Sequence, residues 1–145
     1  MQNNKTPMPV LPPKERITCF DEVALGYSEE DAINEANRCL HCKNRPCVSG
    51  CPVGVHIPEF IEKIAKGDYE EAFKIIKETN SLPGVCGRVC PQEMQCEAKC
   101  VRGIKGEPVG IGRLERFAAD WHRLHAKQSA PKEIKPNGKK VAVIG

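Results

Sequence analysis

The chain has 145 residues, 40% of them hydrophobic but only 5% aromatic, with nine cysteines and a formal net charge of +3. This length suits one compact domain with tails and excludes a second full domain, and the small, scattered charge gives no indication of nucleic-acid binding. No secretory signal and no apolar run of roughly 20 residues is visible, so we expect a cytoplasmic protein without a membrane anchor. In a reducing cytosol, so many cysteines favour metal ligation over disulfides.

The N-terminal part is predicted to be an extended arm over residues 1–27. Four prolines within the first 13 positions disfavour a continuous helix there. A helix is expected to begin after Ser28, because its hydroxyl can cap the helix and three acidic residues follow it. Apolar residues recur at helical spacing as far as Leu40, which places Cys39 at the end of this helix.

Two more helices are expected after a cysteine-rich loop at 41–55. The first has Pro58 in its first turn and Gly67 at its C-terminal end. The second begins at Asp68 and is ended by Asn80 and Pro83. Their apolar faces predict an antiparallel pair whose role is packing.

A last helix is expected to begin near Gly110. Its apolar positions form one stripe from Ile111 to Leu124. Glu115 borders this stripe, and an acidic side chain beside a core requires a specific partner. The helical domain is therefore predicted to span residues 28–126.

The C-terminal residues have a different character. Residues 127–139 have the polar, proline-containing composition of a linker. Residues 140–145 follow the pattern of a short buried strand that ends at Gly145. A dinucleotide-binding domain opens in this way, so Gly145 is a candidate first glycine of a truncated dinucleotide motif.

The cysteines fall into two groups with ligand-like spacing, C-x2-C-x4-C-x3-C-P and C-x3-C-P-x4-C-x3-C. The groups consist of Cys39, Cys42, Cys47 and Cys51, and of Cys86, Cys90, Cys96 and Cys100. The first resembles the ferredoxin run C-x2-C-x2-C-x3-C-P, in which three close thiolates bind one 4Fe-4S cluster and the fourth binds another. Two clusters are therefore indicated.

If the ligands cross between clusters in this way, the first cluster is bound by Cys39, Cys42, Cys47 and Cys100. The second cluster is then bound by Cys51, Cys90 and Cys96. Its fourth ligand remains open between Cys86 and Glu115. Cys19 stands alone in the arm and is expected to be an ordinary free thiol.

A structural zinc ion in each cysteine quartet is the main alternative. Zinc sites usually pair C-x2-C knuckles, and only Cys39 and Cys42 have that spacing, so iron–sulfur ligation is favoured. His41 and His56 lie near the first group, but four cysteines already satisfy it, and we expect neither histidine to be a ligand. No third orienting group accompanies a cysteine–histidine pair, which argues against a hydrolase.

These motifs together resemble the N-terminal iron–sulfur domain of the NADPH-dependent glutamate synthase small (beta) subunit family. The same module begins dihydropyrimidine dehydrogenase and the large subunit of NADH-dependent ferredoxin:NADP oxidoreductase. The likeness runs from F-D-E-V-A-L-G-Y at 20–27, through both cysteine groups, to I-G-R-L-E-R-F at 111–117 and V-A-V-I-G at 141–145. It implies an all-α, helical two-cluster ferredoxin-like domain, followed by the truncated first strand of a dinucleotide-binding domain.

The resemblance also implies the crossed ligand sets described above. It assigns the fourth position of the second cluster to Glu115, where dihydropyrimidine dehydrogenase has Gln, and it gives Cys86 no ligand role. In the family, hydride from NADPH reaches FAD in the following domains, and the helical domain relays single electrons between FAD and a partner redox centre.

The expected function is therefore that of an electron-transfer domain of an NADPH-linked flavin oxidoreductase. Its expected partners are the flavin domain of the same natural chain and a redox subunit or domain, with FAD and NADPH bound only downstream. As a fragment or truncated product, the chain alone is not expected to turn over NADPH. The alternatives are a zinc-stabilised interaction module without a redox role and a stand-alone ferredoxin-like carrier.

Overall fold

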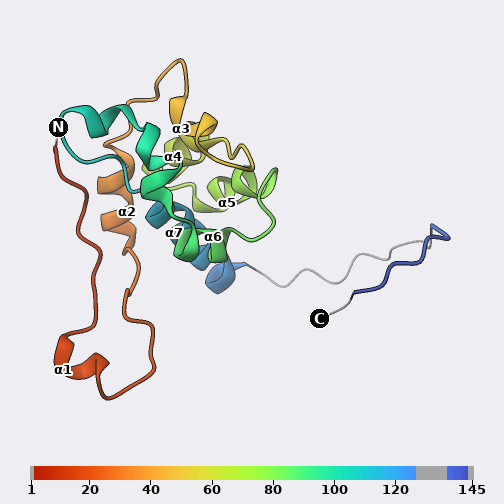
Figure 1. Cartoon of the computed structure of the whole chain (residues 1–145), viewed down its shortest axis with the longest axis horizontal. Coiled ribbons are helices and arrows are strands. Elements are labelled where there is room, and N and C mark those ends of the chain that lie inside the picture. Colours follow the sequence, from red (N-terminus) through yellow and green to blue (C-terminus); the bar gives the residue numbers. More distant parts are fainter. Residues whose placement is uncertain (1, 127–136, 144–145) are drawn as a thin grey trace.

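The computed structural model describes residues 2–126 and 137–143, and the fold of these residues is all-α (Figure 1). Within them, the main helices are α2 (Glu29–Ala36), α4 (Ile57–Ala65), α5 (Tyr69–Lys77), α6 (Pro83–Val89) and α7 (Ile111–His125). The connections contain the single-turn helices α1 (Pro13–Arg16) and α3 (Pro46–Ser49) and the 3-10 turns η1 (Gln92–Met94), η2 (Glu97–Lys99) and η3 (Val101–Ile104). None of the helices in the described residues is long and apolar enough to cross a bilayer.

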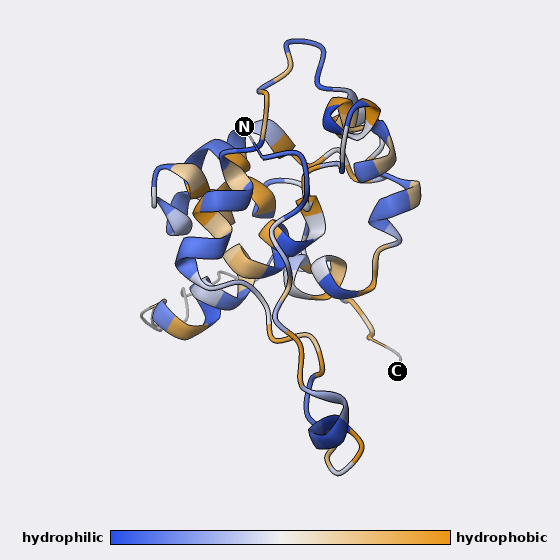
Figure 2. Ribbon diagram, turned by 90° about the vertical axis from the view of Figure 1, so that its left-hand side faces the viewer, coloured by the Kyte–Doolittle hydropathy of each residue, from blue (hydrophilic) through white to orange (hydrophobic). Residues whose placement is uncertain are grey.

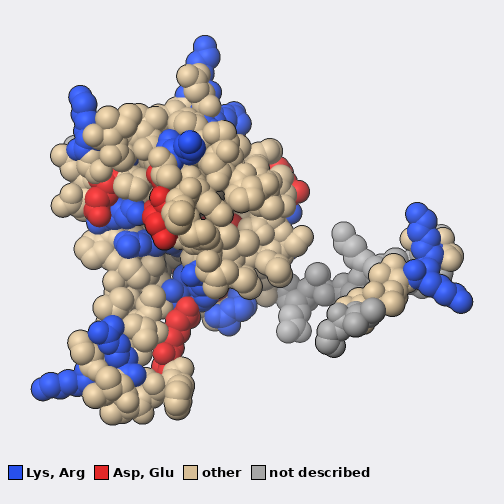
Figure 3. Space-filling view, in the orientation of Figure 1, with Lys and Arg blue, Asp and Glu red and all other residues tan. Residues whose placement is uncertain are grey.

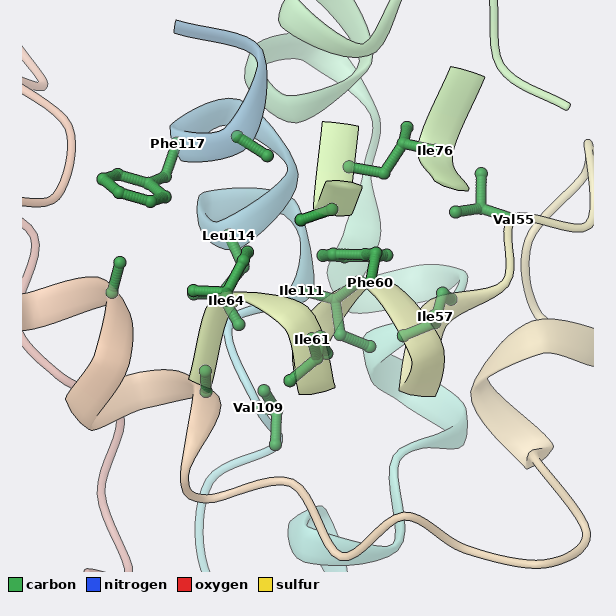
Figure 4. Packing of buried hydrophobic residues seen from close by; sticks show 14 of the residues in the cluster. Val55, Ile57, Phe60, Ile61, Ile64, Ile76, Val109, Ile111, Leu114 and Phe117 are labelled. Atoms are coloured by element: carbon green, nitrogen blue, oxygen red, sulfur yellow. The ribbon is translucent and has the colours of Figure 1, made fainter. Parts of the chain in front are cut away.

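Helix α7 lies at the centre and contacts α2, α4, α5 and α6. The core forms where apolar side chains of α4, α5 and α7 meet, and Figure 4 shows these side chains pointing into the space between the helices. Its most deeply buried members include Phe60, Ile61, Ile64, Ile76 and Leu114. Each such side chain contributes roughly 1.5–3 kcal/mol by leaving water.

Helix α2 begins as predicted but ends early. Ser28 Oγ accepts a hydrogen bond from Asp31 N at 3.1 Å, and the Asp31 carboxylate accepts one from Ser28 N at 3.2 Å, which completes a capping box. The helix ends at Ala36, so Cys39 lies in the turn beyond it and Leu40 is 43% exposed. The predicted end was therefore wrong, because the chain turns at residue 37 and brings the next side chain into the interior.

That side chain belongs to Arg38, which forms a buried ion pair with Glu35. Arg38 Nη1 donates to Glu35 Oε1 at 2.5 Å, and neither side chain is more than 1% exposed. The two Glu35 oxygens also accept from Gly110 N at 2.7 Å and from Thr6 N at 2.6 Å. Arg38 Nη2 donates to the Glu107 carbonyl at 2.6 Å. The pair therefore fixes the N-terminal arm and the segment before α7 against α2.

The helix pair α4 and α5 agrees with the sequence. Gly67 follows α4 with φ of +75°, a left-handed conformation that glycine adopts without strain. The Asp68 side chain accepts from Glu71 N at 3.3 Å and caps α5. These two helices contact each other along their lengths, as predicted.

Helix α6 was not predicted, because Pro83 was taken only as a helix stop. Instead Pro83 occupies the first turn of α6, where a missing N–H costs nothing. A Cβ atom at Gly87 would lie 2.6 Å from Arg116 N. The glycine therefore lets α6 lie directly against α7, and this packing stabilises a segment with low helical propensity.

The N-terminal segment, which was predicted to be an extended arm, contains a hairpin and a short helix. Residues 9–25 form a narrow hairpin that projects from the body, with hydrophobic residues along both of its sides (Figure 2). Leu11 N donates to the Val23 carbonyl at 2.8 Å, Leu25 N donates to the Pro9 carbonyl at 2.8 Å, and α1 forms the turn.

The C-terminal end of the chain differs from the sequence prediction in two respects. Leu124 is 68% exposed, so the apolar stripe of α7 stops short of the predicted limit because the last turn extends beyond the core. Most of the predicted linker, residues 127–136, lies outside the described residues, as does Gly145. Residues 140–143 are exposed and form no strand, so the buried strand is not confirmed. A strand requires neighbouring strands, and among the described residues only one isolated bridge exists, between Val10 and Ala24.

Candidate functional site

Four cysteines from distant parts of the sequence line one pocket, which we call site 1. They are Cys39, Cys42, Cys47 and Cys100. The rest of the lining is mostly apolar and includes Leu40, Ile57, Ile61, Val109 and Ile111. The structure therefore brings Cys100 to the first cysteine group, as the crossed arrangement requires.

Local backbone geometry shapes site 1. His41 and Arg45, which bracket Cys42, have φ of 47° and 44°, in the left-handed region that non-glycine residues seldom adopt. These two turns curl the loop around the pocket. On the opposite wall, Val109 N donates to Cys100 Sγ at 3.5 Å.

The thiols of site 1 lie in a poorly solvated environment. Burial raises the pKa of Cys47 to about 11, and the neighbouring Cys39 and Cys100 thiols raise it further. Burial also raises the pKa of Cys39. Raised thiol pKa values are the reverse of what a nucleophilic cysteine needs, whereas bound metal supplies the positive charge that makes thiolates stable. Site 1 is therefore suited to ligation and unsuited to covalent catalysis.

The remaining predicted ligands gather at a second location, which we call site 2 and define as Cys51, Cys90, Cys96 and Glu115. Burial raises the pKa of Cys90 to about 11, with further contributions from Cys86, Glu115 and Cys51. Burial raises the pKa of Cys96 to about 12, with contributions from Glu97, Cys51 and Glu115. Cys51 and Glu115 each contribute to the raised pKa of both Cys90 and Cys96, which indicates that the four side chains lie near one another.

Glu115 is the unusual member of site 2, since it is an acidic residue that is only 8% exposed. Burial raises its pKa to about 7, although a hydrogen bond from Asn80 opposes the shift. Asn80 Nδ2 donates to Glu115 Oε1 at 2.6 Å. Asn80 Oδ1 accepts from Leu82 N at 2.9 Å and from Cys86 Sγ at 3.6 Å. Both candidate fourth ligands, Glu115 and Cys86, are therefore positioned by one amide.

Asn80 was missed as a functional residue in the sequence, where its expected role was to help end a helix. Its position before Leu82 and Pro83 is typical of a helix-terminating asparagine. Its contact with Glu115, 35 residues later in the chain, cannot be predicted from the sequence around Asn80.

Cys19 and His56 have other contacts. All nine cysteines are free, and Cys19 contacts the Glu15 carbonyl in the projecting hairpin. His56 Nδ1 lies 3.3 Å from Glu78 Oε2, where it takes part in no cysteine site. In the described part of the chain, no group of three or more His, Cys, Asp or Glu side chains is placed to hold a single metal ion. The thiols of site 1 therefore line a pocket without meeting at one point.

The donor sets of the two sites match the requirements of iron–sulfur clusters. Four thiols with an apolar shell provide soft ligands away from water, and such an environment suits an iron–sulfur cube. Three thiols and one buried carboxyl oxygen provide a second set of four donors. The residues present therefore fit the cofactor that the spacing predicts.

Comparison with known families decides between iron–sulfur and zinc. A family model described as dihydropyrimidine dehydrogenase domain II, 4Fe-4S cluster, matches residues 16–127. The chain belongs to this family. It is thus an iron–sulfur domain of a kind that serves electron transfer, and the resemblance seen in the sequence is confirmed.

Similar proteins include oxidoreductase subunits. The chain is 37% identical to the glutamate synthase [NADPH] small chain of Halomonas elongata over 92% of its length and 39% identical to that of Escherichia coli over 94%. It is 39% identical to the NAD-dependent dihydropyrimidine dehydrogenase subunit PreT of Salmonella typhimurium over 87%. The matches cover 28%, 29% and 30% of these relatives. The chain therefore spans less than a third of the length of the curated relatives it matches.

Proposed function

We propose that the chain holds two 4Fe-4S clusters, one at site 1 and one at site 2. As a ferredoxin-like relay, it would pass single electrons between a flavin domain of the same natural chain and a redox centre on a partner. The observation that carries the proposal is the convergence of the four site 1 cysteines on one apolar pocket. When bound, the clusters supply reversible one-electron chemistry.

The protein residues have three tasks in this proposal. The cysteine thiols lose their protons on loading, so cofactor binding releases protons and depends on pH. The apolar wall of site 1, which includes Ile57 and Ile61, excludes water. Asn80 holds one oxygen of Glu115 and leaves the other free to serve as a ligand. Cys86 is expected to remain a free thiol.

The larger enzyme is proposed from the names of the relatives. Two kinds of relative are named for NADPH or NAD, and both are much longer than this chain. We therefore propose an NADPH-linked flavoprotein of the glutamate synthase type, in which residues 140–145, including Gly145, begin the FAD-binding domain. The 145-residue chain alone would not oxidise NADPH. A cytoplasmic, reducing setting is proposed with it, because free thiols are maintained there.

Elemental analysis of anaerobically prepared protein tests this function. We expect about eight irons and eight acid-labile sulfides per chain, with broad visible absorbance that dithionite bleaches. About two zinc ions per chain, without sulfide or colour, would instead favour a structural zinc module and contradict the relay.

A further inference from the structure

The two segments that supply the cysteines of site 1 are strongly basic. Residues 39–47 and 99–106 contain no Asp or Glu and five basic residues, namely Lys43, Arg45, Lys99, Arg102 and Lys105. In contrast, residues 51–55 and 86–98, which supply the cysteines of site 2, contain one Arg and two Glu. The segments that supply site 1 are therefore basic, and those that supply site 2 are close to neutral.

The basic residues surround exposed apolar side chains at the entrance of site 1. Leu40 is 43% exposed, Val101 is 39% exposed and Ile104 is 78% exposed. Leu40 and Val101 line both the pocket of site 1 and a neighbouring groove that continues to Ile104 and Lys105. We call Leu40, Lys43, Val101, Ile104 and Lys105 the site 1 rim.

Lys43 lies on the other side of the entrance. It lines a hollow together with Cys42 and Pro58, which also line the pocket of site 1. Figure 3 shows Lys and Arg side chains projecting at the top and upper left of the molecule, where Figure 1 places the loop before α3 and the teal turns near residue 100. The rim therefore has an apolar centre with positive charge on both sides.

Two acidic residues, Glu59 and Glu62, line the same hollow as Lys43, and each is paired with a basic residue. Glu59 forms an ion pair with Arg45, and Glu62 Oε1 lies 2.5 Å from Lys66 Nζ. Glu107 Oε2 accepts from Lys5 N at 2.7 Å. For the described residues, no ion pair is found for Lys43 or Lys105, which leaves their charges available.

We propose that the site 1 rim is the docking surface for an acidic redox protein or domain that exchanges one electron with site 1. This inference rests on the proposed function of site 1. A partner whose carboxylates surround an apolar contact would complement the rim in both charge and polarity. Interfaces of electron-transfer proteins are small and short-lived, and opposite charges speed their encounter by roughly 10- to 1,000-fold.

A matched pair of electron acceptors tests the charge requirement. Native cytochrome c is basic, whereas cytochrome c with succinylated lysines is acidic and carries the same haem. In each reaction, one electron leaves the dithionite-reduced chain and converts ferric haem to ferrous haem, with no bond made or broken. We expect the succinylated form to react at least about tenfold faster in dilute buffer, and the advantage to shrink at about 0.5 M salt. Equal rates, or a faster reaction of the native form, would overturn the proposal.

Charge-reversal variants locate the surface. Lys43→Glu combined with Lys105→Glu should remove most of the preference for the acidic acceptor. The control combines Lys14→Glu with Arg16→Glu, which makes the same change in net charge on α1 in the projecting hairpin. This control should keep the preference, and an equal loss in both variants would mean that net charge acts without a docking surface.

A second pair of variants tests the apolar centre. Ile104 and Ile17 are similarly exposed, at 78% and 80%. Ile104→Ser should slow the reaction with the acidic acceptor several-fold even at high salt, whereas Ile17→Ser should leave it unchanged. Equal behaviour of the two variants would contradict an apolar contact at the rim.

The same samples separate this inference from the proposed function. Iron, sulfide and dithionite bleaching are measured in every variant. If these show no clusters, the proposed function fails and the docking surface fails with it. If the clusters are present and bleach but the acceptor preference is missing, only the docking surface is wrong.

Discussion

Site 1 lies against the apolar core and beneath a basic surface, whereas site 2 lies among amide and carboxyl groups. The walls of site 1 are side chains such as Ile61 and Val109, and one backbone N–H reaches a cysteine sulfur there. Site 2 includes Glu115, and Asn80 and Glu97 lie around it. Cysteine thiols are therefore placed in two electrostatic environments within one small domain.

This difference shows how a protein can give two clusters different reduction potentials and so set the direction of electron transfer. Positive surroundings stabilise an added electron, and negatively charged groups around a cluster destabilise it. A cluster at site 1 should therefore have a higher reduction potential than one at site 2. Electrons would then move from site 2 to site 1 and leave at the rim.

The largest predicted effect comes from removing one ligand from each site. Cys100→Ser should lower iron from about eight to about four per chain, because it opens only site 1. Cys51→Ser should remove the other four irons, because it opens only site 2. Cys86→Ser should keep all eight irons. Iron and sulfide analysis measures the result. Loss of the site 2 signal in Cys86→Ser but not in Glu115→Gln would show that the cysteine is the fourth ligand.

The next effect concerns the buried ion pair that supports site 1. Arg38→Met leaves Glu35 charged and unpaired in the interior, so the free energy of unfolding should fall by about 3–5 kcal/mol. Urea denaturation of the loaded protein gives this value, and site 1 should lose its cluster before site 2. Lys77→Met removes an exposed lysine and should change stability by no more than about 0.5 kcal/mol. A similar loss in both variants would contradict the anchoring role of Arg38.

Two glycines of α6 provide a matched test of the support for site 2. Gly87→Ala forces a methyl group against Arg116, so stability should fall by about 1–3 kcal/mol and the site 2 spectrum should change. At Gly84 the nearest atom to an added Cβ is Ala119 Cβ, at 3.7 Å, which is an ordinary contact. Gly84→Ala should therefore be neutral or slightly stabilising. Thermal unfolding and visible circular dichroism distinguish the two.

Site 2 also predicts a pH dependence in cluster-free protein. The fold raises the pKa of the Glu115 carboxyl from 4.5 to about 7, so the folded state favours the protonated form. The stability contributed by this group is fully present below pH 4.5 and is lost as the pH rises through about 7. Glu115→Gln should flatten the stability curve in this range. An unchanged curve, measured by urea unfolding, would show that the carboxyl group is not buried.

The smallest effect is expected from the amide that holds Glu115. Asn80→Asp keeps an oxygen that accepts from Leu82 N but replaces the donor facing Glu115 with a negative oxygen. The potential of site 2 should fall by about 60 mV, a tenfold change in the redox equilibrium, while site 1 remains as an internal reference. A parallel shift at both sites would indicate a general change in the fold.

Much of the helical framework could be predicted because its signals are local. The cap at Ser28, the glycine at 67 and the apolar spacing of α4 and α7 each act within a few residues. The approach of Cys100 to the first cysteine group could also be anticipated from the resemblance to ferredoxin spacing, in which a cysteine before proline binds the other cluster.

The features that were missed depend on contacts between distant segments. Helix α6 exists because Gly87 allows it to approach α7, and Glu35 and Arg38 resemble solvated surface charges until the arm covers them. Helix α2 ends at Ala36, where the chain turns and buries Arg38 against Glu35. Leu40, which the helical spacing predicted to be buried, is therefore exposed. Such contacts depend on the packing of the whole domain, so no short stretch of the sequence carries a pattern that predicts them.

An anaerobic redox titration of the loaded chain, followed by electron paramagnetic resonance, tests the central claim most directly. We predict two one-electron steps at different potentials. The higher step should disappear in Cys100→Ser, and only the lower step should shift in Glu115→Gln. A single step, or a higher step that responds to Glu115, would contradict two clusters in different electrostatic surroundings.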